Sequence, residues 1–479
     1  MNANAQQFRR ATDAKAFDLN HRAIVVKNTN TYHAAVARGL ARFADWETAR
    51  RRAAAVKWEV MNHLDRYLEQ FERNVQAKGG HVHWAETGAE ASQLVVSLAK
   101  QHGIRKVVKS KSMVTEEIHL NPSLEAAGVT VLETDLGEYI CQLRGEPPYH
   151  IVTPVMHLNR AQIAKTFNEK FGTSLDATAE QLAGIAREKL RAEFLAADMG
   201  ISGGNFAVAD TGMVGICTNE GNGRLTTALP RLHIAIVGIE KLVPRLEDLA
   251  LFWPLLATRG TGQFLTVYNT LIGGSENFHV ILLDNGRTKL LADVEQRDAL
   301  HCIRCGACLN ACPVYKAVGG HSYGTTYQGP LGSMITPHLR GWQEWSHLPY
   351  ASSLCGKCAD VCPAHIPIHH HLLHNRRNSI RQHCDSPLQR LAFRIWLWAM
   401  QSPGLYAIGG KLVRLAMRLG IAQPLAKAWT VQRDLPEAPQ ESFREWWNST
   451  GCHPERSEGP LHQTAEILRS AQNDSKRQT

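Results

Sequence analysis

The sequence predicts three consecutive parts: an α/β amino-terminal domain with a mainly parallel sheet, an α-helical domain built on cysteine motifs, and a helical, basic carboxyl-terminal region. Strand-like and helix-like segments alternate between residues 80 and 295, which is typical of a parallel sheet covered by helices. Seven of the eleven cysteines lie between residues 302 and 362. Residues 369–433 contain ten Lys and Arg against one Asp, an excess equal to the formal net charge of +9.

A helical segment precedes the α/β domain and occupies residues 1–79 in the predicted organisation. Apolar Val36, Leu40 and Trp46 recur on one face of a helical pattern over about 32–76, with charges on the other face. The cysteine domain follows the α/β domain at 296–385, the basic amphipathic region occupies 386–447, and residues 448–479 form a tail.

The α/β domain is predicted from short apolar runs that alternate with helical patterns. The predicted strands are 81–84, 106–108, 129–132, 150–155, 206–209, 214–217, 232–238, 264–270 and 280–283, the last of which need not be parallel. The predicted helices are 89–102, 115–127, 160–168 and 178–195. All of these strands are expected to belong to one sheet.

The loops that follow the strands are the candidate substrate site, because ligands bind outside the carboxyl ends of strands in open α/β sheets. The candidate residues are Asp210, Thr211, Asn219, Glu220 and Arg224. The alternative is that these loops contain only ordinary turn residues. No Walker or dinucleotide-binding fingerprint occurs in the sequence.

Two shorter polar segments also follow strands. Residues 109–112, Lys-Ser-Lys-Ser, are interpreted as a solvated loop, with an anion cradle at the following helix as the alternative. Asp135 ends the segment 133–135 and is interpreted as a helix cap, with an acid–base or substrate-binding role as the alternative.

The cysteine spacing predicts paired iron-sulfur clusters. The first run is C-x2-C-x2-C-x3-C-P, and the second is C-x2-C-x3-C-P, a pattern in which the last cysteine of each run binds the other cluster. The predicted ligands are Cys302, Cys305, Cys308 and Cys362 for cluster 1, and Cys312, Cys355 and Cys358 for cluster 2. Structural zinc is the less typical alternative for this spacing.

Cluster 2 has only three evident thiolates, because Ser352 stands where the pattern would place a cysteine. The cluster is either a 4Fe-4S cube, with Ser352, water or a partner's ligand on its fourth iron, or a 3Fe-4S cluster. Cys384 is a further candidate, although lone cysteines usually behave as small buried apolar residues.

The remaining cysteines indicate a reducing compartment, because Cys141, Cys217, Cys384 and Cys452 have no disulfide-framework spacing. No secretory or twin-arginine signal is evident, and no apolar run reaches the roughly 18 residues of a spanning helix. We therefore expect a cytoplasmic protein, with the inner face of the membrane as a possible peripheral location.

The basic region interleaves its charges with apolar residues at spacings that fit two amphipathic helices, separated at Pro403 and Gly404. These helices are expected to pack on the chain's own domains, to dock a partner subunit, or to lie on an anionic membrane surface where quinones reside. A nucleic-acid partner is not expected, because no recognition module is present.

Five segments together resemble those of one family. V-V-K-S-K-S-M-V-T-E-E and T-N-E-G-N-G-R precede C-I-R-C-G-A-C-L-N-A-C-P, and the linker G-G-H-S-Y-G-T-T-Y-Q-G-P-L-G leads to L-C-G-K-C-A-D-V-C-P. From about 30 to 447 the chain resembles the iron-sulfur B subunits of bacterial lactate-utilisation systems. The resemblance implies an isomerase/CoA-transferase-like fold for the α/β domain and a ferredoxin-type dicluster domain. A shared fold does not by itself imply the catalytic chemistry of those enzymes.

The resemblance also implies that the protein acts with two partner subunits in oxidising L-lactate to pyruvate, as a non-catalytic electron-transfer component. Two alternatives remain: a self-sufficient hydroxy-acid oxidoreductase with its substrate site in the amino-terminal domain, and a cluster-based redox sensor. No catalytic residue is assigned. The tail beyond residue 447 is similar to a translated bacterial repeat element and is expected to be disordered.

Overall fold

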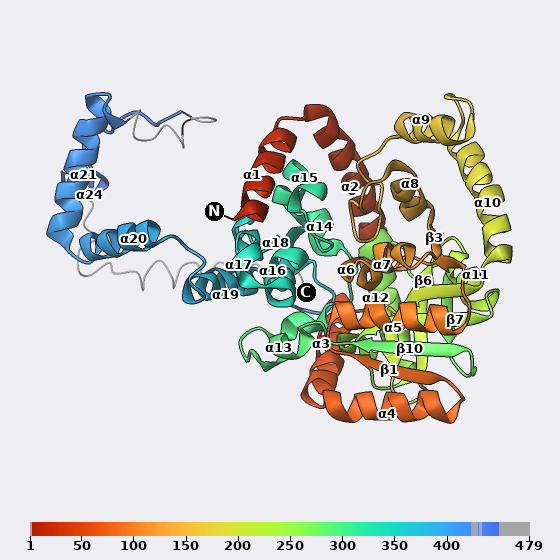
Figure 1. Ribbon diagram of the computed structural model, residues 1–479. Coiled ribbons are helices and arrows are strands. Elements are labelled where there is room, and N and C mark those ends of the chain that lie inside the picture. The colour runs from red at the N-terminus through yellow and green to blue at the C-terminus, as the bar shows by residue number, and fades with distance from the viewer. Residues whose placement is uncertain (1, 423–429, 431–433, 450–479) are drawn as a thin grey trace, which may run out of the picture. The chain divides into compact units, whose positions relative to one another are not determined.

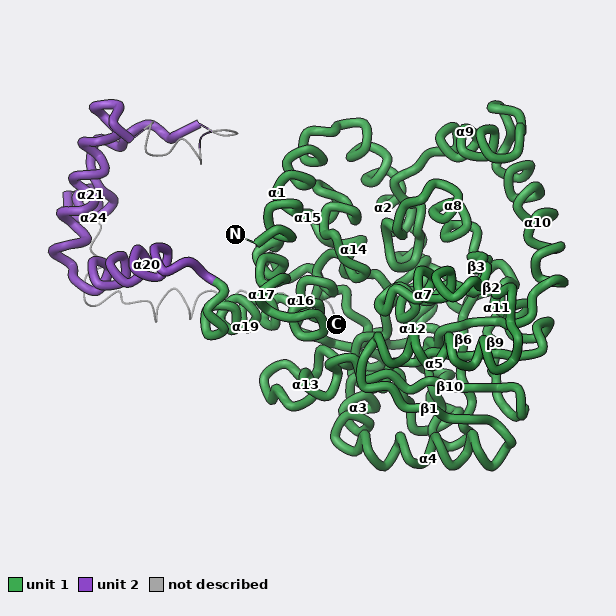
Figure 2. Tube along the Cα trace, in the orientation of Figure 1, with its two compact units in different colours: residues 1–384 green, residues 385–479 purple. Residues whose placement is uncertain are grey.

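The computed structural model describes residues 2–422, 430 and 434–449, and the chain divides into two compact units, residues 1–384 and 385–479 (Figure 2). The first unit contains the helical segment, the α/β segment and the cysteine segment. These three segments share one buried core, in which Val25, Phe71, Val237 and Cys308 belong to the same cluster. The boundaries predicted at 79 and 295 therefore fall within one compact unit.

The amino-terminal segment consists of four helices, which begin earlier than the sequence pattern indicates. They are α1 (Ala3–Ala16), α2 (Leu19–Leu40), α3 (Trp46–Asn62) and α4 (Leu64–Ala77). Asp18 and Asp45 cap α2 and α3 by accepting hydrogen bonds from backbone N–H groups. The apolar face of α4 is buried through Tyr67, Phe71 and Val75.

The main sheet has six strands, all parallel, in the order β1-β10-β7-β4-β2-β3. The strands are β1 (His81–Ala85), β2 (Lys106–Lys109), β3 (Thr130–Glu133), β4 (Met199–Gly203), β7 (Leu232–Gly238) and β10 (Phe278–Leu283). Every residue of β4, β7 and β10 is buried, as expected for strands covered on both faces. The fold class is that of the prediction, an α/β domain with a mainly parallel sheet.

Helices cover this sheet, with α4 along the β1 edge and α5 across β1 and β10 (Figure 1). The helices of the α/β segment are α5 (Gly88–Gln101), α6 (Met113–Glu117), α7 (Leu120–Ala126), α8 (Leu136–Arg144), α9 (Arg160–Phe171), α10 (Ala179–Ala196), α11 (Asn222–Ala228), α12 (Leu249–Thr261) and α13 (Arg287–Ala292). Two 3-10 turns, η1 (Ile239–Lys241) and η2 (Leu246–Asp248), follow β7.

A second sheet corrects the expectation of one continuous sheet. Its four strands lie in the order β8-β5-β6-β9, with β6 antiparallel to both β5 and β9. They are β5 (Phe206–Val208), β6 (Met213–Thr218), β8 (Leu242–Val243) and β9 (Tyr268–Ile272). A tight turn between β5 and β6 makes a hairpin, and a hairpin cannot place both strands in a parallel sheet.

Three other expectations about elements are wrong. Residues 150–155 form turns and bends in place of a strand. The central strand β4 was missed, because Met-Gly-Ile-Ser-Gly is short and two of its residues are glycines. The helix predicted over 115–127 is two helices, separated at His119, whose φ of 52° interrupts the helical backbone.

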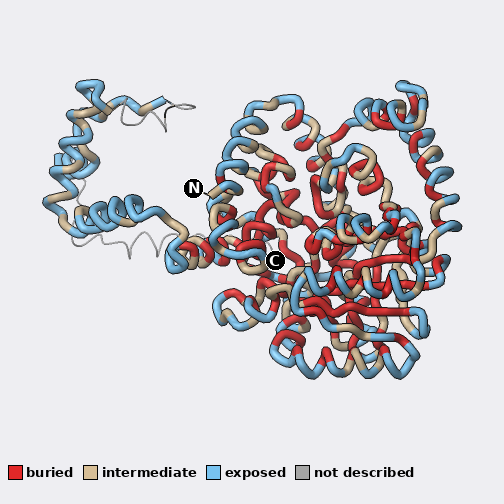
Figure 3. Tube along the Cα trace, viewed as in Figure 1, coloured by how far each residue is buried: buried red, intermediate tan, exposed pale blue. Residues whose placement is uncertain are grey.

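The cysteine segment is helical and forms part of the buried core (Figure 3). Its elements are η3 (Arg297–His301), α14 (Ala307–Ala311), α15 (Pro313–Val318), η4 (His321–Tyr323), α16 (Gly329–Arg340), α17 (Trp342–Trp345), η5 (Leu348–Tyr350), α18 (Lys357–Asp360) and α19 (Ile368–Arg381). Tyr315, Tyr323 and Tyr327 are buried, as expected for packing around the cysteines.

The second unit is helical and basic in its described part. It contains α20 (Pro387–Met400), α21 (Pro403–Arg418) and α24 (Phe443–Ser449), and none of these helices has a buried residue. Within residues 2–422, 430 and 434–449, no helix combines the length and apolarity needed to cross a bilayer. Of the tail predicted to be disordered, residues 450–479, with Cys452, lie outside the described residues.

Candidate cluster site and adjacent cavity

The two cysteine loops have the same backbone conformation. Arg304 and Leu354, each directly before a cysteine, have φ angles of 60° and 57°. Gly306 directly follows Cys305, and Gly356 directly follows Cys355. Their φ angles are 76° and 80°. Left-handed angles turn the chain back after each thiol, and glycine adopts them without a Cβ clash. The repeated conformation shows that the two motifs are structural equivalents.

The electrostatic neighbours of the seven motif thiols are compatible with the two predicted ligand sets. Cys308 is within electrostatic range of Cys302, Cys305 and Cys362. Cys312 and Cys358 likewise interact with Cys355. The first cysteine group, as we call it, is Cys302, Cys305, Cys308 and Cys362, and the second cysteine group is Cys312, Cys355 and Cys358. Cys308 is also within range of Cys358, so the groups are neighbours.

This donor chemistry fits iron-sulfur clusters. Backbone N–H groups point at several of the thiols: Arg304 N lies 3.4 Å from Cys302 Sγ, and Ile366 N lies 3.4 Å from Cys362 Sγ. Such N–H···S contacts are among the interactions that set cluster potentials. Burial raises the pKa of the Cys305 thiol to about 12, and a bound metal ion would favour its thiolate form.

Ser352 occupies the position equivalent to Cys302. The backbone N–H of Leu354 donates to Ser352 Oγ at 3.1 Å, and the N–H of Arg304 makes the same contact to Cys302 Sγ. Arg376 holds this loop from α19 by donating to the carbonyl oxygens of Pro349 at 3.0 Å and Ser352 at 2.9 Å. An oxygen therefore stands where the first motif has a sulfur ligand.

Cations surround the first cysteine group. Lys57, Lys241 and Arg304 all interact electrostatically with Cys302. Arg259 interacts with Cys305 and Cys362, and its guanidinium lies 4.5 Å from the ring centroid of Trp46. Lys57, Lys241 and Arg259 are buried, and the Arg304 side chain is 9% exposed. Water screens their charges only weakly at these positions.

The second cysteine group lies nearer the surface. Cys355 is exposed, and a hydrogen bond from the backbone of Lys357 lowers the pKa of its thiol. Lys316, which is partly exposed, is the cation that interacts with Cys312. This group therefore has one thiol fewer, more solvent and a weaker positive field than the first.

A buried ionic network supports the first group. Arg287 donates to both carboxylate oxygens of Glu117 at 2.9 Å and to Glu240 at 2.5 Å. Arg304 pairs with the other oxygen of Glu240 at 3.2 Å, and Tyr327 donates its hydroxyl to Glu117 at 2.7 Å. Burial favours the neutral acid, but the adjacent arginines outweigh it and hold the pKa of Glu240 at about 2. The network ties the α/β segment to the first cysteine loop.

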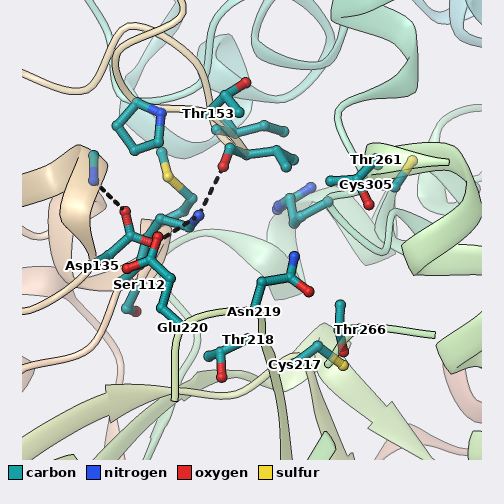
Figure 4. A pocket seen from close by; sticks show the side chains of 18 of the residues that line it. Ser112, Asp135, Thr153, Cys217, Thr218, Asn219, Glu220, Thr261, Thr266 and Cys305 are labelled. Carbon is teal, nitrogen blue, oxygen red and sulfur yellow. Dashed lines mark hydrogen bonds and ion pairs between the residues drawn. The ribbon is translucent and has the colours of Figure 1, made fainter. Parts of the chain in front are cut away.

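A cavity of about 670 Å³ lies beside this group, at the carboxyl ends of β2, β3, β4 and β7. Cys305 and Arg304 form part of its wall, together with Lys241. In Figure 4, Asp135 and Glu220 lie on one side of the cavity, Cys305 and Thr261 lie on the opposite side, and Asn219 lies between them. The cavity thus connects the sheet edge that usually binds ligands to a cluster ligand.

The acidic side of the cavity consists of Asp135 and Glu220, with Lys111 nearby. Lys111 Nζ lies 3.4 Å from an Asp135 oxygen, and the backbone N–H of Leu136 donates to Glu220 at 2.9 Å. Burial and the charge of Asp135 raise the pKa of Glu220 to about 7. Asp135 also caps α8, which is the role interpreted from the sequence.

The structure places the five predicted substrate residues in different surroundings. Asn219 and Glu220 line the cavity. Asp210 accepts a hydrogen bond from Leu246 N at 3.1 Å, near the β5–β6 turn that contains Thr211, and neither lines the cavity. Arg224, on α11, lies 5.7 Å from the ring centroid of Tyr268 and is also outside the cavity wall.

The interpretation of residues 109–112 as a solvated loop is wrong. Lys109 is fully buried and pairs with Glu116 and Glu133, both at 2.7 Å. Ser112 caps α6 by accepting a hydrogen bond from Thr115 N. Sequence reasoning also missed Lys241 and Arg304 as cavity residues. The available signals were the position of Lys241 just after an apolar strand and that of Arg304 between two cysteines.

The chain matches three family models in succession. Residues 68–285 match the LUD domain, residues 298–366 match the 4Fe-4S dicluster domain, and residues 377–452 match the carboxyl-terminal model of lactate utilisation protein B. Together with the two cysteine groups, these matches define an iron-sulfur protein in which a LUD domain precedes a dicluster domain.

Curated relatives share nearly the whole chain. A lactate utilization protein B from Shouchella clausii is 45% identical over 85% of this chain and 89% of its own. The protein of the same name from Bacillus velezensis is 43% identical over 84% of this chain and 88% of its own. The chain belongs to the lactate utilization protein B family. A solved DUF162 family structure from Deinococcus radiodurans is 16% identical and covers 46% of this chain and 98% of its own, with a TM-score of 0.25.

Proposed function

We propose that this protein relays electrons through two iron-sulfur clusters during the oxidation of L-lactate to pyruvate. The observation that carries the proposal is a pair of cysteine loops with the same backbone conformation and seven neighbouring thiols, within a chain of the lactate utilization protein B family. Lactate oxidation releases two electrons, and a cluster accepts one at a time. Two adjacent clusters therefore suit a two-electron oxidation.

The proposed ligands follow the two groups. Cluster 1 is held by Cys302, Cys305, Cys308 and Cys362, and cluster 2 by Cys312, Cys355 and Cys358, with Ser352 Oγ as its fourth ligand. Both clusters are proposed to be 4Fe-4S. Support for Ser352 comes from its equivalence to Cys302 and from the matching backbone hydrogen bond.

The proposed role in the reaction is electron transfer and not bond making. When bound, the clusters would supply the one-electron redox chemistry. Buried Tyr315 and Tyr323 lie beside Cys312, and Lys57, Lys241 and Arg304 place positive charge beside Cys302. The exposed Cys355 marks the side at which electrons are exchanged with another protein.

The proposed partners are two other lactate-utilisation subunits, in the cytoplasm or at the inner membrane surface. In the second unit, α20 and α21 expose Trp396, Trp398 and Leu412 beside arginines, a combination that supports contact with a partner or with anionic lipid. A quinone-reducing partner would then be within reach. Cosedimentation with anionic vesicles, compared with neutral vesicles, separates the lipid from the protein partner.

A second candidate function is hydroxy-acid oxidation by the chain itself. The observation that favours it is the cavity, which joins the acidic pair Asp135 and Glu220 to the wall that contains Cys305. In this case the electrons of the substrate would enter cluster 1 directly. The two candidate functions differ in whether the isolated chain responds to lactate.

Anaerobic purification of the full chain tests both candidates. Iron and sulfide are counted, and EPR spectra are recorded as isolated, after dithionite, and after L-lactate. We expect two clusters that dithionite reduces and that lactate reduces only when the partner subunits are added. Reduction by lactate without partners would establish the second candidate. A chain without iron or sulfide after anaerobic reconstitution would overturn both.

A further inference from the structure

Lys241 lies beside the first cysteine group, and its side chain also faces a cavity for which the proposed relay has no use. Its side chain lines the cavity and the residue is 5% exposed. Within the part of the chain that the structure describes, no group accepts a hydrogen bond from its ammonium. Its neighbour Glu240 is already engaged with Arg287 and Arg304. The ammonium of Lys241 is therefore free to donate a hydrogen bond to an anion in the cavity, at a position where little solvent screens its charge.

Arg304 provides a second cationic group in the same wall. One of its terminal nitrogens pairs with Glu240, whereas Nε and Nη1 are buried without a partner among the described residues. The guanidinium lies 4.7 Å from the ring centroid of Tyr327, which restricts its orientation. Arg304 therefore adds a second positive charge to this wall, at a position where solvent screens it weakly. Lys241 and Arg304 thus form a cationic end to the cavity.

The rest of the cavity has more apolar wall than a small polar molecule would contact. Much of its wall is apolar and comes from α8 and the turns that follow it: Ile140, Ile151, Val152, Val155, Met156 and Leu158. Its volume of about 670 Å³ lies within the range of pockets that enclose drug-sized ligands. A three-carbon acid would leave most of this space and the whole apolar wall unused.

We propose that the cavity binds an organic carboxylate with an apolar body longer than that of lactate, with its carboxylate held by Lys241 and Arg304. The apolar body lies along the wall of α8 and residues 151–158. The bound carboxylate shares its cations with the first cysteine group, so binding makes reduction of that cluster less favourable. Only this last consequence rests on the proposed function, because it requires the cluster.

Isothermal titration calorimetry on the anaerobically purified full chain tests the site. The probes are L-lactate and straight-chain L-2-hydroxy acids of four, six and eight carbons, at constant ionic strength. We expect the affinity to rise about fourfold for each added methylene that the wall buries. Lys241→Gln should weaken binding of the eight-carbon acid about tenfold or more, because a charged hydrogen bond is lost. Lys289→Gln, at an exposed position on α13, is the matched control and should have no effect.

A wall variant keeps the test independent of the cations. Val155→Phe fills part of the apolar space, and should weaken binding of the eight-carbon acid more than that of lactate. A redox titration with and without the eight-carbon acid gives the second readout, and the first cluster should become harder to reduce when the acid is bound.

Three results would overturn the proposal. The first is an affinity that does not depend on chain length. The second is equal binding of inorganic sulfate and the eight-carbon acid. The third is a Lys241→Gln variant that changes the cluster potential but not binding, since the cation would then serve the cluster alone. Failure of lactate and the partner subunits to reduce the clusters, with chain-length-dependent binding intact, would count against the relay and not against this site.

Discussion

The two cysteine groups share one loop design, and each has buried thiols, but their surroundings differ. In the first group, Cys305, Cys308 and Cys362 are buried, and buried cations and the ionic network of Arg287 lie around them. In the second group, Cys355 is exposed, a serine stands at the equivalent of Cys302, and the positive field is weaker. Repeated backbone geometry would therefore not give two clusters of equal potential, because charge and solvent set cluster potentials.

In the proposed relay, this difference would give the two clusters separate tasks. The first adjoins the cavity through Cys305 and has cations that favour the added electron. The second has an exposed ligand, and electron exchange with another protein requires a cluster near the surface. Electrons that enter near the cavity would leave at Cys355, and the variants below test whether the two groups are as different as their surroundings indicate.

Removal of a first-group thiol should have the largest effect. Cys308→Ala takes away the thiol that contacts the whole first group, so we expect iron and sulfide to fall to about half and the EPR signal of one reduced cluster to vanish. Cys141→Ala, at a buried cysteine outside the motifs, is the control and should keep its iron. A Cys308→Ala chain with its full iron content would show that the first group is not a cluster site.

The ionic network should account for the next largest effect. Arg287→Met leaves Glu117 and Glu240 buried without their shared partner, so we expect a loss of about 3–5 kcal/mol in the free energy of unfolding. Urea unfolding followed by circular dichroism measures it. Arg73→Met, which removes an exposed pair with Glu69, should cost about 0–1 kcal/mol. Equal losses in the two variants would mean that the first group has no special structural support.

The sequence predicted what depends on local spacing. The cysteine runs, most strands of the parallel sheet and the helices over 89–102 and 178–195 follow from patterns that a few residues determine. The central strand β4 was missed because its apolar signal is divided by glycines. The second sheet was missed because strand partners are chosen by packing over long separations, which periodicity does not record.

The site shows the same limit. Asn219 and Glu220 could be proposed because they follow a strand, but Lys241 and Arg304 line the cavity only because the cysteine loop packs against the end of β7. Asp210 and Arg224 are also polar residues that follow strands in the sequence. The antiparallel hairpin and α11 nevertheless place them outside the cavity wall. Residue type and loop position therefore do not determine which side chains meet.

The difference in nearby cations between the two cysteine groups should appear as a smaller shift in reduction potential. Arg259→Met removes a buried charge near Cys305, so we expect the potential of one cluster to fall by roughly 40–130 mV, which corresponds to about 1–3 kcal/mol for one electron. Lys316→Met, near Cys312, should shift the other cluster less, because solvent screens its charge. An EPR-monitored redox titration measures both. If the Lys316 variant shifts more, the proposed contrast between the groups is reversed.

Substitutions at Ser352 test the smallest expected difference between the two cysteine groups, because they change a single proposed ligand atom. If Ser352 Oγ binds the fourth iron, Ser352→Ala should lose about one iron per chain and show a 3Fe-4S signal when oxidised. Ser352→Cys should keep the wild-type iron content but alter the EPR spectrum of the second cluster, since sulfur replaces oxygen at the position equivalent to Cys302. Unchanged iron and spectra in both variants would remove Ser352 from the ligand set and leave water or a partner's residue on that iron.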